Sequence, residues 1–206
     1  SGVMTSLGNK LGLYKALAGA SALTSDDLAT KTGLHERYVR EWLNNQVAGG
    51  YIIYQPQDGT YELPDAHALV LAVDGSPVFL VPALEVCASL WFDRDKIENA
   101  FRSGDGIAWK DHHEGLFCGC EALFKPGYEA SLVADWIGAL DGVQDRLSAG
   151  GRIADVGCGH GASAIILAKA FPNSTVYGFD SHVESIDIAR QRASEAGLSG
   201  NLRFET

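Results

Sequence analysis

The segment Arg152-Ile-Ala-Asp155-Val-Gly157-Cys-Gly159-His-Gly161 decides the fold of the C-terminal part of the chain. It is a short apolar strand that runs into a glycine-rich turn, and residues 162–171 continue as an apolar helix. A second strand, residues 175–180, ends in a carboxylate, and a helix over residues 184–196 follows and is closed by Gly197. Strand, helix, strand and helix at these lengths predict a right-handed βαβ unit of a parallel sheet.

The glycine-rich turn predicts a ligand site. Its three glycines allow a ligand to approach the backbone closely at the N-terminus of a helix. Gly157-x-Gly159-x-x-Ala162 also satisfies the loose dinucleotide fingerprint, and Asp180 lies at the distance expected of a ribose-binding acid in either case. Asp155 favours another ligand, because a carboxylate two residues before the first glycine repels a pyrophosphate and attracts a cation. We therefore expect S-adenosylmethionine, which carries an ammonium and a sulfonium, rather than a nicotinamide or flavin dinucleotide.

Residues 1–73 have the pattern of a winged helix, an N-terminal domain that precedes the βαβ unit. Apolar residues at helical spacing, a cap at Thr24 or Ser25, and glycines after the second and third helices support this interpretation. The pair Asp58-Gly59 predicts the turn of a hairpin. Three helices and then two strands are predicted, over residues 3–18, 24–33, 35–48, 51–54 and 61–63.

The charge of this domain argues against DNA binding. Up to Val73 it carries five basic and seven acidic residues, and Arg37 and Arg40 of the third helix are offset by Glu36 and Glu41. A DNA-binding face needs several cations that neutralise phosphates. We therefore expect a structural, dimerising domain, and the uncapped apolar start of the first helix predicts a homodimer.

A helical connector is predicted over residues 74–130. A helix is expected over residues 81–98, followed by a loop rich in glycine and aromatic residues and by a further helix over residues 128–147. Several apolar side chains are expected to face inward from the third helix of the winged helix and from the helix over residues 81–98: Tyr38, Leu84, Cys87, Leu90, Trp91 and Ile97. The helix over residues 128–147 has apolar residues at four positions: Leu132, Trp136, Leu140 and Val143.

The motifs resemble those of a known family. Asp155-Val-Gly-Cys-Gly-His-Gly161 is similar to motif I of the class I S-adenosylmethionine-dependent methyltransferases, and Gly178-Phe-Asp180 is similar to their second motif. The acidic winged helix and residues 106–128 resemble the bacterial small-molecule methyltransferases that carry a dimerising winged-helix domain. The resemblance implies an α/β Rossmann-like methyltransferase domain over residues 131–206. It also implies methyl transfer to an oxygen, nitrogen or carbon of a small molecule.

The resemblance also implies the roles of individual residues. Asp155 would hold the amino group of the cofactor, and Asp180 would accept hydrogen bonds from both ribose hydroxyls. The remaining cofactor-binding candidates shape the methionine end, lie beside the ribose and adenine, or close over the cofactor: Gly157, Cys158, Gly159, Gly161, Ser181, His182, Phe124 and Tyr128. His113 is the candidate general base that deprotonates an acceptor. Two alternatives stay open, a winged-helix transcription regulator that senses a nucleotide-like ligand and a dinucleotide-dependent oxidoreductase.

No metal site is expected. His112, His113, Cys118 and Cys120 lie within nine residues, but Cys-x-Cys is not the spacing of a zinc knuckle, and a packed loop is preferred. His160 lies inside the glycine turn, where its backbone is expected to matter more than its ring.

Composition sets further limits. The chain has 206 residues, a net charge of −10 and four irregularly spaced cysteines, which indicate a cytoplasmic protein that binds neither membranes nor nucleic acid in general. Residues 201–206 are expected to begin a third strand, so that the motif I strand, central in this fold, would be left at an edge. We therefore expect an incomplete, inactive catalytic domain from a protein of roughly 300–350 residues.

Overall fold

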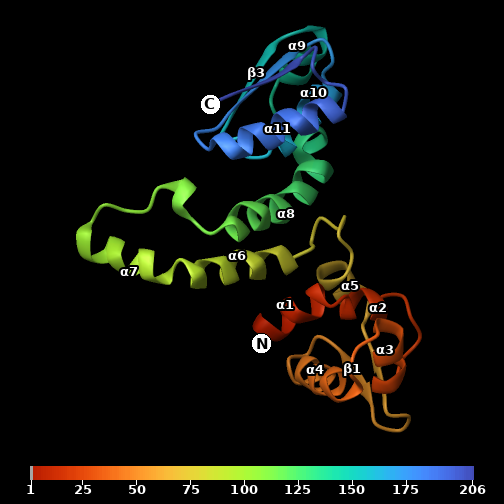
Figure 1. Ribbon diagram of the computed structural model, residues 1–206. Coiled ribbons are helices and arrows are strands. Elements are labelled where there is room, and N and C mark those ends of the chain that lie inside the picture. Colours follow the sequence, from red (N-terminus) through yellow and green to blue (C-terminus); the bar gives the residue numbers. More distant parts are fainter. Residues whose placement is uncertain (1) are drawn as a thin grey trace. The chain divides into compact units, whose positions relative to one another are not determined.

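The computed structural model describes residues 2–206. They form two compact units, one up to Ala88 and the other from Ser89 (Figure 1). Each unit has its own core of buried side chains. The predicted boundaries at residues 73 and 130 stay predictions.

The first unit has the order of elements of a winged helix, as the sequence predicts. Its hairpin pairs Tyr54 with Tyr61 in antiparallel register, and its turn places Gly59 at a φ of 67°. The first strand begins two residues later than predicted, because the N–H of Tyr51 bonds back to the carbonyl of Gln46 at the end of a helix. The elements are α1 (Gly2–Lys10), α2 (Leu13–Leu17), α3 (Ser25–Thr32), α4 (Glu36–Ala48), β1 (Ile53–Gln55), β2 (Thr60–Glu62) and α5 (Asp65–Leu71).

The predicted single helix over residues 3–18 is wrong, because it is broken into α1 and α2. Gly12 adopts a φ of 70°, a left-handed conformation that ends one helix and precedes the next. The break turns Leu13 and Leu17 into the core while α1 lies against Trp42. Gly8 permits this approach, since a Cβ there would lie 2.5 Å from the Trp42 ring.

The capping of α3 agrees with the prediction. Thr24 accepts a hydrogen bond from the N–H of Asp27, whose carboxylate accepts the N–H of Thr24 in return. This capping box satisfies two N–H groups that a helix start leaves unpaired.

One burial prediction on α4 is wrong. Tyr38 was expected inside but is 76% exposed, because the buried face of α4 is formed by Val39, Trp42 and its neighbours.

The connector differs most from its prediction. The helix expected over residues 81–98 ends at Phe92, where the buried Asp93 separates two helices, and Leu90 and Trp91 are exposed. The expected loop before residue 128 is largely a helix that continues through Pro126. Trp136 and Leu140, two of the apolar residues of the further helix, are about half exposed. The elements are α6 (Val81–Phe92), α7 (Arg94–Ser103), η1 (Trp109–Asp111), α8 (Glu114–Ser131), the π-helix η2 (Leu132–Ile137) and α9 (Val143–Ala149).

The C-terminal part is the predicted βαβ unit extended by one strand. The three strands are parallel in the order β3-β4-β5, with Asp155 opposite Gly178 and Gly178 opposite Phe204. Both crossovers step in the same direction, so α10 and α11 cover one face of the sheet (Figure 1). In the part of the chain that the structure describes, β3 pairs with β4 alone, and Val156 on it is 83% exposed. The elements are β3 (Arg152–Val156), α10 (Ala162–Ala170), β4 (Thr175–Phe179), α11 (Val183–Glu195) and β5 (Leu202–Glu205).

No helix within residues 2–206 combines the length and the apolar character that a membrane crossing requires.

The close packing of β4 on β5 can be tested at Gly178. A Cβ there would lie 2.4 Å from the Phe204 ring and 3.0 Å from the sulfur of Cys158, so we expect Gly178→Ala to lower the free energy of unfolding by about 1–3 kcal/mol. Gly200→Ala is the matched control, because a Cβ there meets no atom within 4 Å and Gly200 is not among the glycines with positive φ. Urea denaturation followed by circular dichroism measures both. Equal stability of the two variants would contradict the packing described.

Candidate functional site

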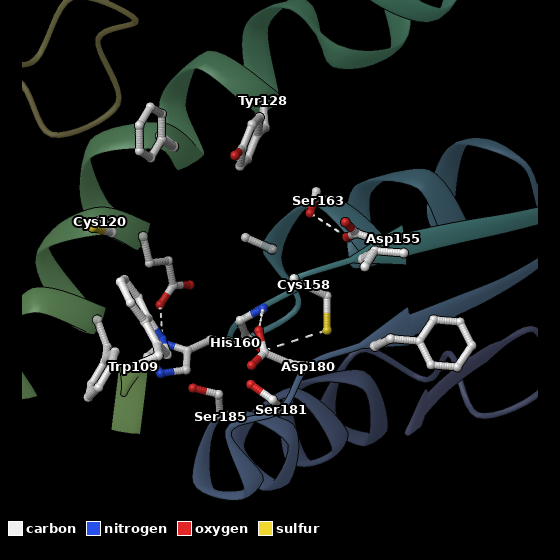
Figure 2. A pocket seen from close by; sticks show the side chains of 18 of the residues that line it. Trp109, Cys120, Tyr128, Asp155, Cys158, His160, Ser163, Asp180, Ser181 and Ser185 are labelled. Carbon is white, nitrogen blue, oxygen red and sulfur yellow. Dashed lines mark hydrogen bonds and ion pairs between the residues drawn. The ribbon is translucent and has the colours of Figure 1, made fainter. Parts of the chain in front are cut away.

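A pocket of about 810 Å³ lies in the second unit, at the carboxyl ends of β3 and β4. The glycine turn and the ends of the two strands form one side, and residues of η1 and α8 form the other. Figure 2 shows Tyr128 facing the pocket from α8, with Asp155 and Ser163 on one side and Asp180 and Ser181 on another. Ligands of open α/β sheets bind at this end of the strands.

The glycine turn forms because the residues at 157, 159 and 161 all have positive φ, of 78°, 51° and 79°. The N–H groups of Gly157 and Cys158 both donate to the carbonyl of Phe179, at 2.8 and 3.0 Å, and this anchors the turn to the end of β4. A Cβ added at Gly157 or Gly159 meets no atom within 4 Å, so the space above the turn is open. Gly161 faces the core instead, 2.6 Å from the Phe204 ring by the same measure, and does not line the pocket.

Asp180 connects the two loops of the site. Its carboxylate accepts hydrogen bonds from the N–H of Gly159 at 2.8 Å and from the N–H of His182 at 2.9 Å. Each oxygen keeps a lone pair for a further donor. The carboxylate is thus held in one orientation before any ligand arrives.

Asp155 is held by a residue that sequence reasoning missed. The hydroxyl of Ser163, in the first turn of α10, donates to the Asp155 carboxylate at 2.6 Å, as Figure 2 shows. Burial raises the pKa of Tyr128, and the negative charge of Asp155 adds to that rise. Tyr128 and Asp155 both line the pocket, as Figure 2 shows.

Aromatic side chains cover the pocket. Phe117, Phe124 and Tyr128 recur at helical spacing on α8, and Trp109 packs edge-on against Phe117 with ring centroids 5.3 Å apart. His182 does not line the pocket, because its ring stacks on Phe117 at 4.7 Å. The spacing of the three α8 residues was a helical signal that the predicted loop overlooked.

The ring of His160, which was expected to matter less than its backbone, makes a buried contact of its own. Its side chain is 7% exposed, and Nδ1 lies 2.6 Å from a carboxylate oxygen of Glu121. Arg192 of α11 pairs with the other oxygen. Sequence reasoning missed Glu121, because the contact spans 39 residues and depends on how α8 lies over the turn.

The candidate general base lies outside the pocket lining. His113 is the N-cap of α8, where Nδ1 accepts the N–H of Gly115 at 3.0 Å, and its ring stacks on Phe92. Asp93, which is fully buried, accepts hydrogen bonds from Lys96, from Nδ1 of His112 and from the N–H of His113. The role of His113 as a general base stays a prediction, and the structure gives this histidine a capping contact.

The cysteine and histidine cluster is likewise dispersed. Cys118 and Cys120 lie on α8 rather than in a packed loop, and only Cys120 lines the pocket. Across residues 2–206, no three His, Cys, Asp or Glu side chains are grouped so that they could hold a metal ion.

The pocket brings together eight of the eleven predicted site residues: Asp155, Gly157, Cys158, Gly159, Asp180, Ser181, Phe124 and Tyr128. Three predicted residues lie outside its lining: Gly161, His182 and His113. The proximity of the eight residues that line the pocket is a geometric fact. The binding and catalytic roles of all eleven residues stay predictions.

Two family models match the chain. Residues 1–73 match the Rv2258c-like winged HTH domain, and residues 147–206 match a methyltransferase domain. The chain joins a winged helix-turn-helix domain to a methyltransferase domain. The expected fold class and family resemblance are confirmed by these matches.

Individual relatives agree with the domain assignment. The chain is 36% identical over 91 residues to the release factor glutamine methyltransferase of Chlorobaculum tepidum, a match that covers 41% of this chain and 29% of that protein. An O-methyltransferase family protein from Burkholderia thailandensis has the same fold, with a TM-score of 0.69 and 17% identity, over 99% of this chain and 59% of that one. The chain therefore spans only part of the length of these two relatives.

A further solved structure with this fold is the O-methyltransferase NcsB1 from neocarzinostatin biosynthesis, in complex with S-adenosylmethionine and 2-hydroxy-5-methyl naphthoic acid. The TM-score is 0.56 at 18% identity, over 100% of this chain and 64% of NcsB1.

The buried Asp93 predicts a pH-dependent contribution to stability. The Lys96 ammonium and the His113 N–H hold the pKa of Asp93 far below its ordinary value of 3.8. A carboxyl with a depressed pKa stabilises the fold above its unfolded pKa and loses that contribution as the pH falls through its folded pKa. We therefore expect Asp93→Asn to lower the free energy of unfolding at neutral pH, and the gap from the parent to shrink below pH 3.8.

Urea unfolding at a series of pH values from about 7 to about 3 measures this gap. Asp95→Asn is the control, because Asp95 is 85% exposed and pairs loosely with Arg94 at 3.4 Å. A gap for Asp93→Asn that stays constant over the whole range would contradict the assignment.

The thiol of Cys158 is predicted to be inert. Burial raises its pKa to about 12, and the charges of Asp155 and Asp180 add to the rise. At about pH 8, roughly one such thiol in ten thousand is ionised, so we expect iodoacetamide to label the exposed Cys118 and Cys87 long before Cys158. Mass spectrometry of the labelled peptides over time decides the order. Labelling of Cys158 as fast as Cys118 would contradict the burial of its thiol.

Proposed function

We propose that the protein transfers a methyl group from S-adenosylmethionine to an oxygen, nitrogen or carbon of a small molecule. The observation that carries the proposal is the joint geometry of the glycine turn and its two carboxylates. Asp155 and Asp180 flank an open glycine turn at the carboxyl ends of β3 and β4. The matched methyltransferase domain and the S-adenosylmethionine complex of NcsB1 support the choice of cofactor.

The residues present fit this cofactor. The space above Gly157 and Gly159 is where a Cβ would meet nothing, so the backbone can contact a ligand directly. Asp155 carries a negative charge toward which an ammonium can point, and Asp180 keeps acceptor capacity for two ribose hydroxyls. The aromatic rings of α8 offer flat apolar surfaces on the opposite side.

The cofactor, when bound, supplies an electrophilic methyl group next to a sulfonium. The chain's own residues contribute alignment and exclusion of water, because methyl transfer is an in-line displacement whose barrier falls mainly by orientation of the reactants. Asp180 and Asp155 are both pre-oriented by hydrogen bonds from Gly159 and Ser163, so little reorganisation accompanies binding. Phe124 and Tyr128, which stack on each other at 6.3 Å, can shield the methyl group from solvent.

The same residues disfavour the alternatives. A dinucleotide would place its pyrophosphate next to the Asp155 carboxylate, which repels it. A DNA-binding regulator would need a cationic α4, but Arg37 and Arg40 form ion pairs with Glu41 and Glu36 on the same helix. Neither alternative has an observation in its favour that the methyltransferase proposal lacks.

We further propose a homodimer formed through the winged-helix domain, and a cytoplasmic location. Exposed apolar side chains on α1, including Val3 at 76%, support the dimer. The four cysteines, all of which are free thiols, support a reducing compartment. Small molecules are the expected acceptors, and the NcsB1 structure holds a small molecule, the naphthoic acid, together with S-adenosylmethionine.

Cofactor binding is the direct test. We expect isothermal calorimetry to show that S-adenosylhomocysteine binds the chain with a micromolar dissociation constant, and that Asp180→Ala weakens binding roughly tenfold to a hundredfold, because the variant loses hydrogen bonds to a charged group. Asp187→Ala on α11 is the control, since Asp187 is 66% exposed and pairs only with Arg190 on its own helix. Absence of binding, or equal binding by Asp180→Ala and the parent, would overturn the proposal.

A further inference from the structure

A buried ionic contact joins three elements beside the pocket. Glu121 of α8 contacts Nδ1 of His160, in the glycine turn, with one carboxylate oxygen and the Arg192 guanidinium of α11 with the other. The side chains of His160 and Glu121 are only 7% and 16% exposed, whereas Arg192 is 40% exposed. We call these three residues the Glu121 bridge.

The protonation state of the bridge follows from its contacts. Burial of Glu121 opposes its ionisation, but the hydrogen bonds from Arg192 and His160 outweigh burial and lower its pKa. An ionised carboxylate only accepts hydrogen bonds, so Nδ1 of His160 must carry the proton. The bridge therefore requires a proton on Nδ1 of His160, which either the Nδ1–H tautomer or the doubly protonated ring supplies.

The turn that His160 belongs to needs such an anchor. Gly159 and Gly161 flank His160, and a glycine loses more conformational freedom on ordering than any other residue. Besides His160, the turn has one other side chain beyond glycine, Cys158, which packs into the core near Gly178. The Glu121 bridge thus fixes the pocket side of the turn while Cys158 fixes the core side.

The Glu121 bridge lies on the same face of α8 as the aromatic residues of the pocket. Phe117, Glu121, Phe124 and Tyr128 follow one another at intervals of four, three and four residues, which places them on one face of α8. Glu121 is the charged member of that set. Its pairing with His160 and Arg192 therefore joins the face of α8 that carries the aromatic rings to the glycine turn and to α11.

We propose that Glu121 is a positioning residue that holds the glycine turn and α8 in the geometry that receives the cofactor. The inference rests on the proposed function. Preorganised sites bind more tightly because less conformational freedom is lost on binding. Removing the charge of Glu121 should therefore weaken cofactor binding without removing any group expected to contact the cofactor.

The test compares Glu121→Gln with Glu129→Gln. Glu129 lies on the same helix but is half exposed and pairs loosely with Lys125 at 3.9 Å, so the control makes the same chemical change without breaking a buried pair. We expect Glu121→Gln to raise the dissociation constant for S-adenosylhomocysteine about tenfold, and Glu129→Gln to change it less than about twofold. Calorimetry on the full chain measures both.

A second readout separates positioning from a general loss of structure. Nitrogen-15 chemical shifts of the His160 ring report which nitrogen carries the proton. We expect a protonated Nδ1 in the parent and in Glu129→Gln, and a shift toward Nε2 protonation in Glu121→Gln. In a double-mutant cycle, Glu121→Gln combined with His160→Gln should cost no more affinity than either change alone.

Each result decides the matter. Unchanged affinity in Glu121→Gln, or weaker affinity with an unchanged His160 tautomer, would overturn the positioning role. If circular dichroism shows that Glu121→Gln does not fold, His160→Gln, which keeps the Glu121–Arg192 pair, is measured instead with the same expected loss of affinity. If the parent does not bind S-adenosylhomocysteine, the proposed function fails. In that case, hydrogen exchange at the amides of Gly159 and His160 tests by itself whether the bridge orders the turn. We expect exchange to be faster in Glu121→Gln than in the parent.

Discussion

The carbonyl of Phe179 is the acceptor on which the site depends. As the last residue of β4, Phe179 receives the N–H groups of Gly157 and Cys158 from the turn after β3. The next residue, Asp180, receives the N–H of Gly159. The turn is therefore held by the end of the neighbouring strand, and its position follows from the parallel register that pairs Val156 with Phe179.

This anchoring explains how backbone polar groups and side-chain charges share the site. The N–H groups of Gly157, Cys158 and Gly159 are satisfied within the protein, so the features left for a ligand are open space above the glycines and two carboxylates. A third carboxylate, on Glu121, is offset by Arg192. The two carboxylates that face the turn, Asp155 and Asp180, suit a cationic ligand better than a phosphate.

The sequence was most informative where local chemistry decides the conformation. The strand and turn from Arg152 to Gly161, the helix cap at Thr24 and the hairpin turn at Gly59 form as predicted, because each depends on residues within a few positions of one another. The predicted single helix over residues 3–18 failed at Gly12, whose left-handed conformation separates α1 from α2. The predicted loop before residue 128 failed at Pro126, which lies inside α8. A glycine or proline permits both outcomes, and packing selects between them.

By itself, the sequence determined the glycine turn and the positions of the acids at 155 and 180, because glycine at positive φ and a carboxylate at a strand end are properties of the residues and their spacing. Only the tertiary structure decided which side chains complete the site. Glu121 meets His160 across 39 residues and Arg192 across 71, and Ser163 reaches Asp155 from another element. Such contacts leave no periodic or local signal, since they arise from how α8, α10 and α11 pack around the turn.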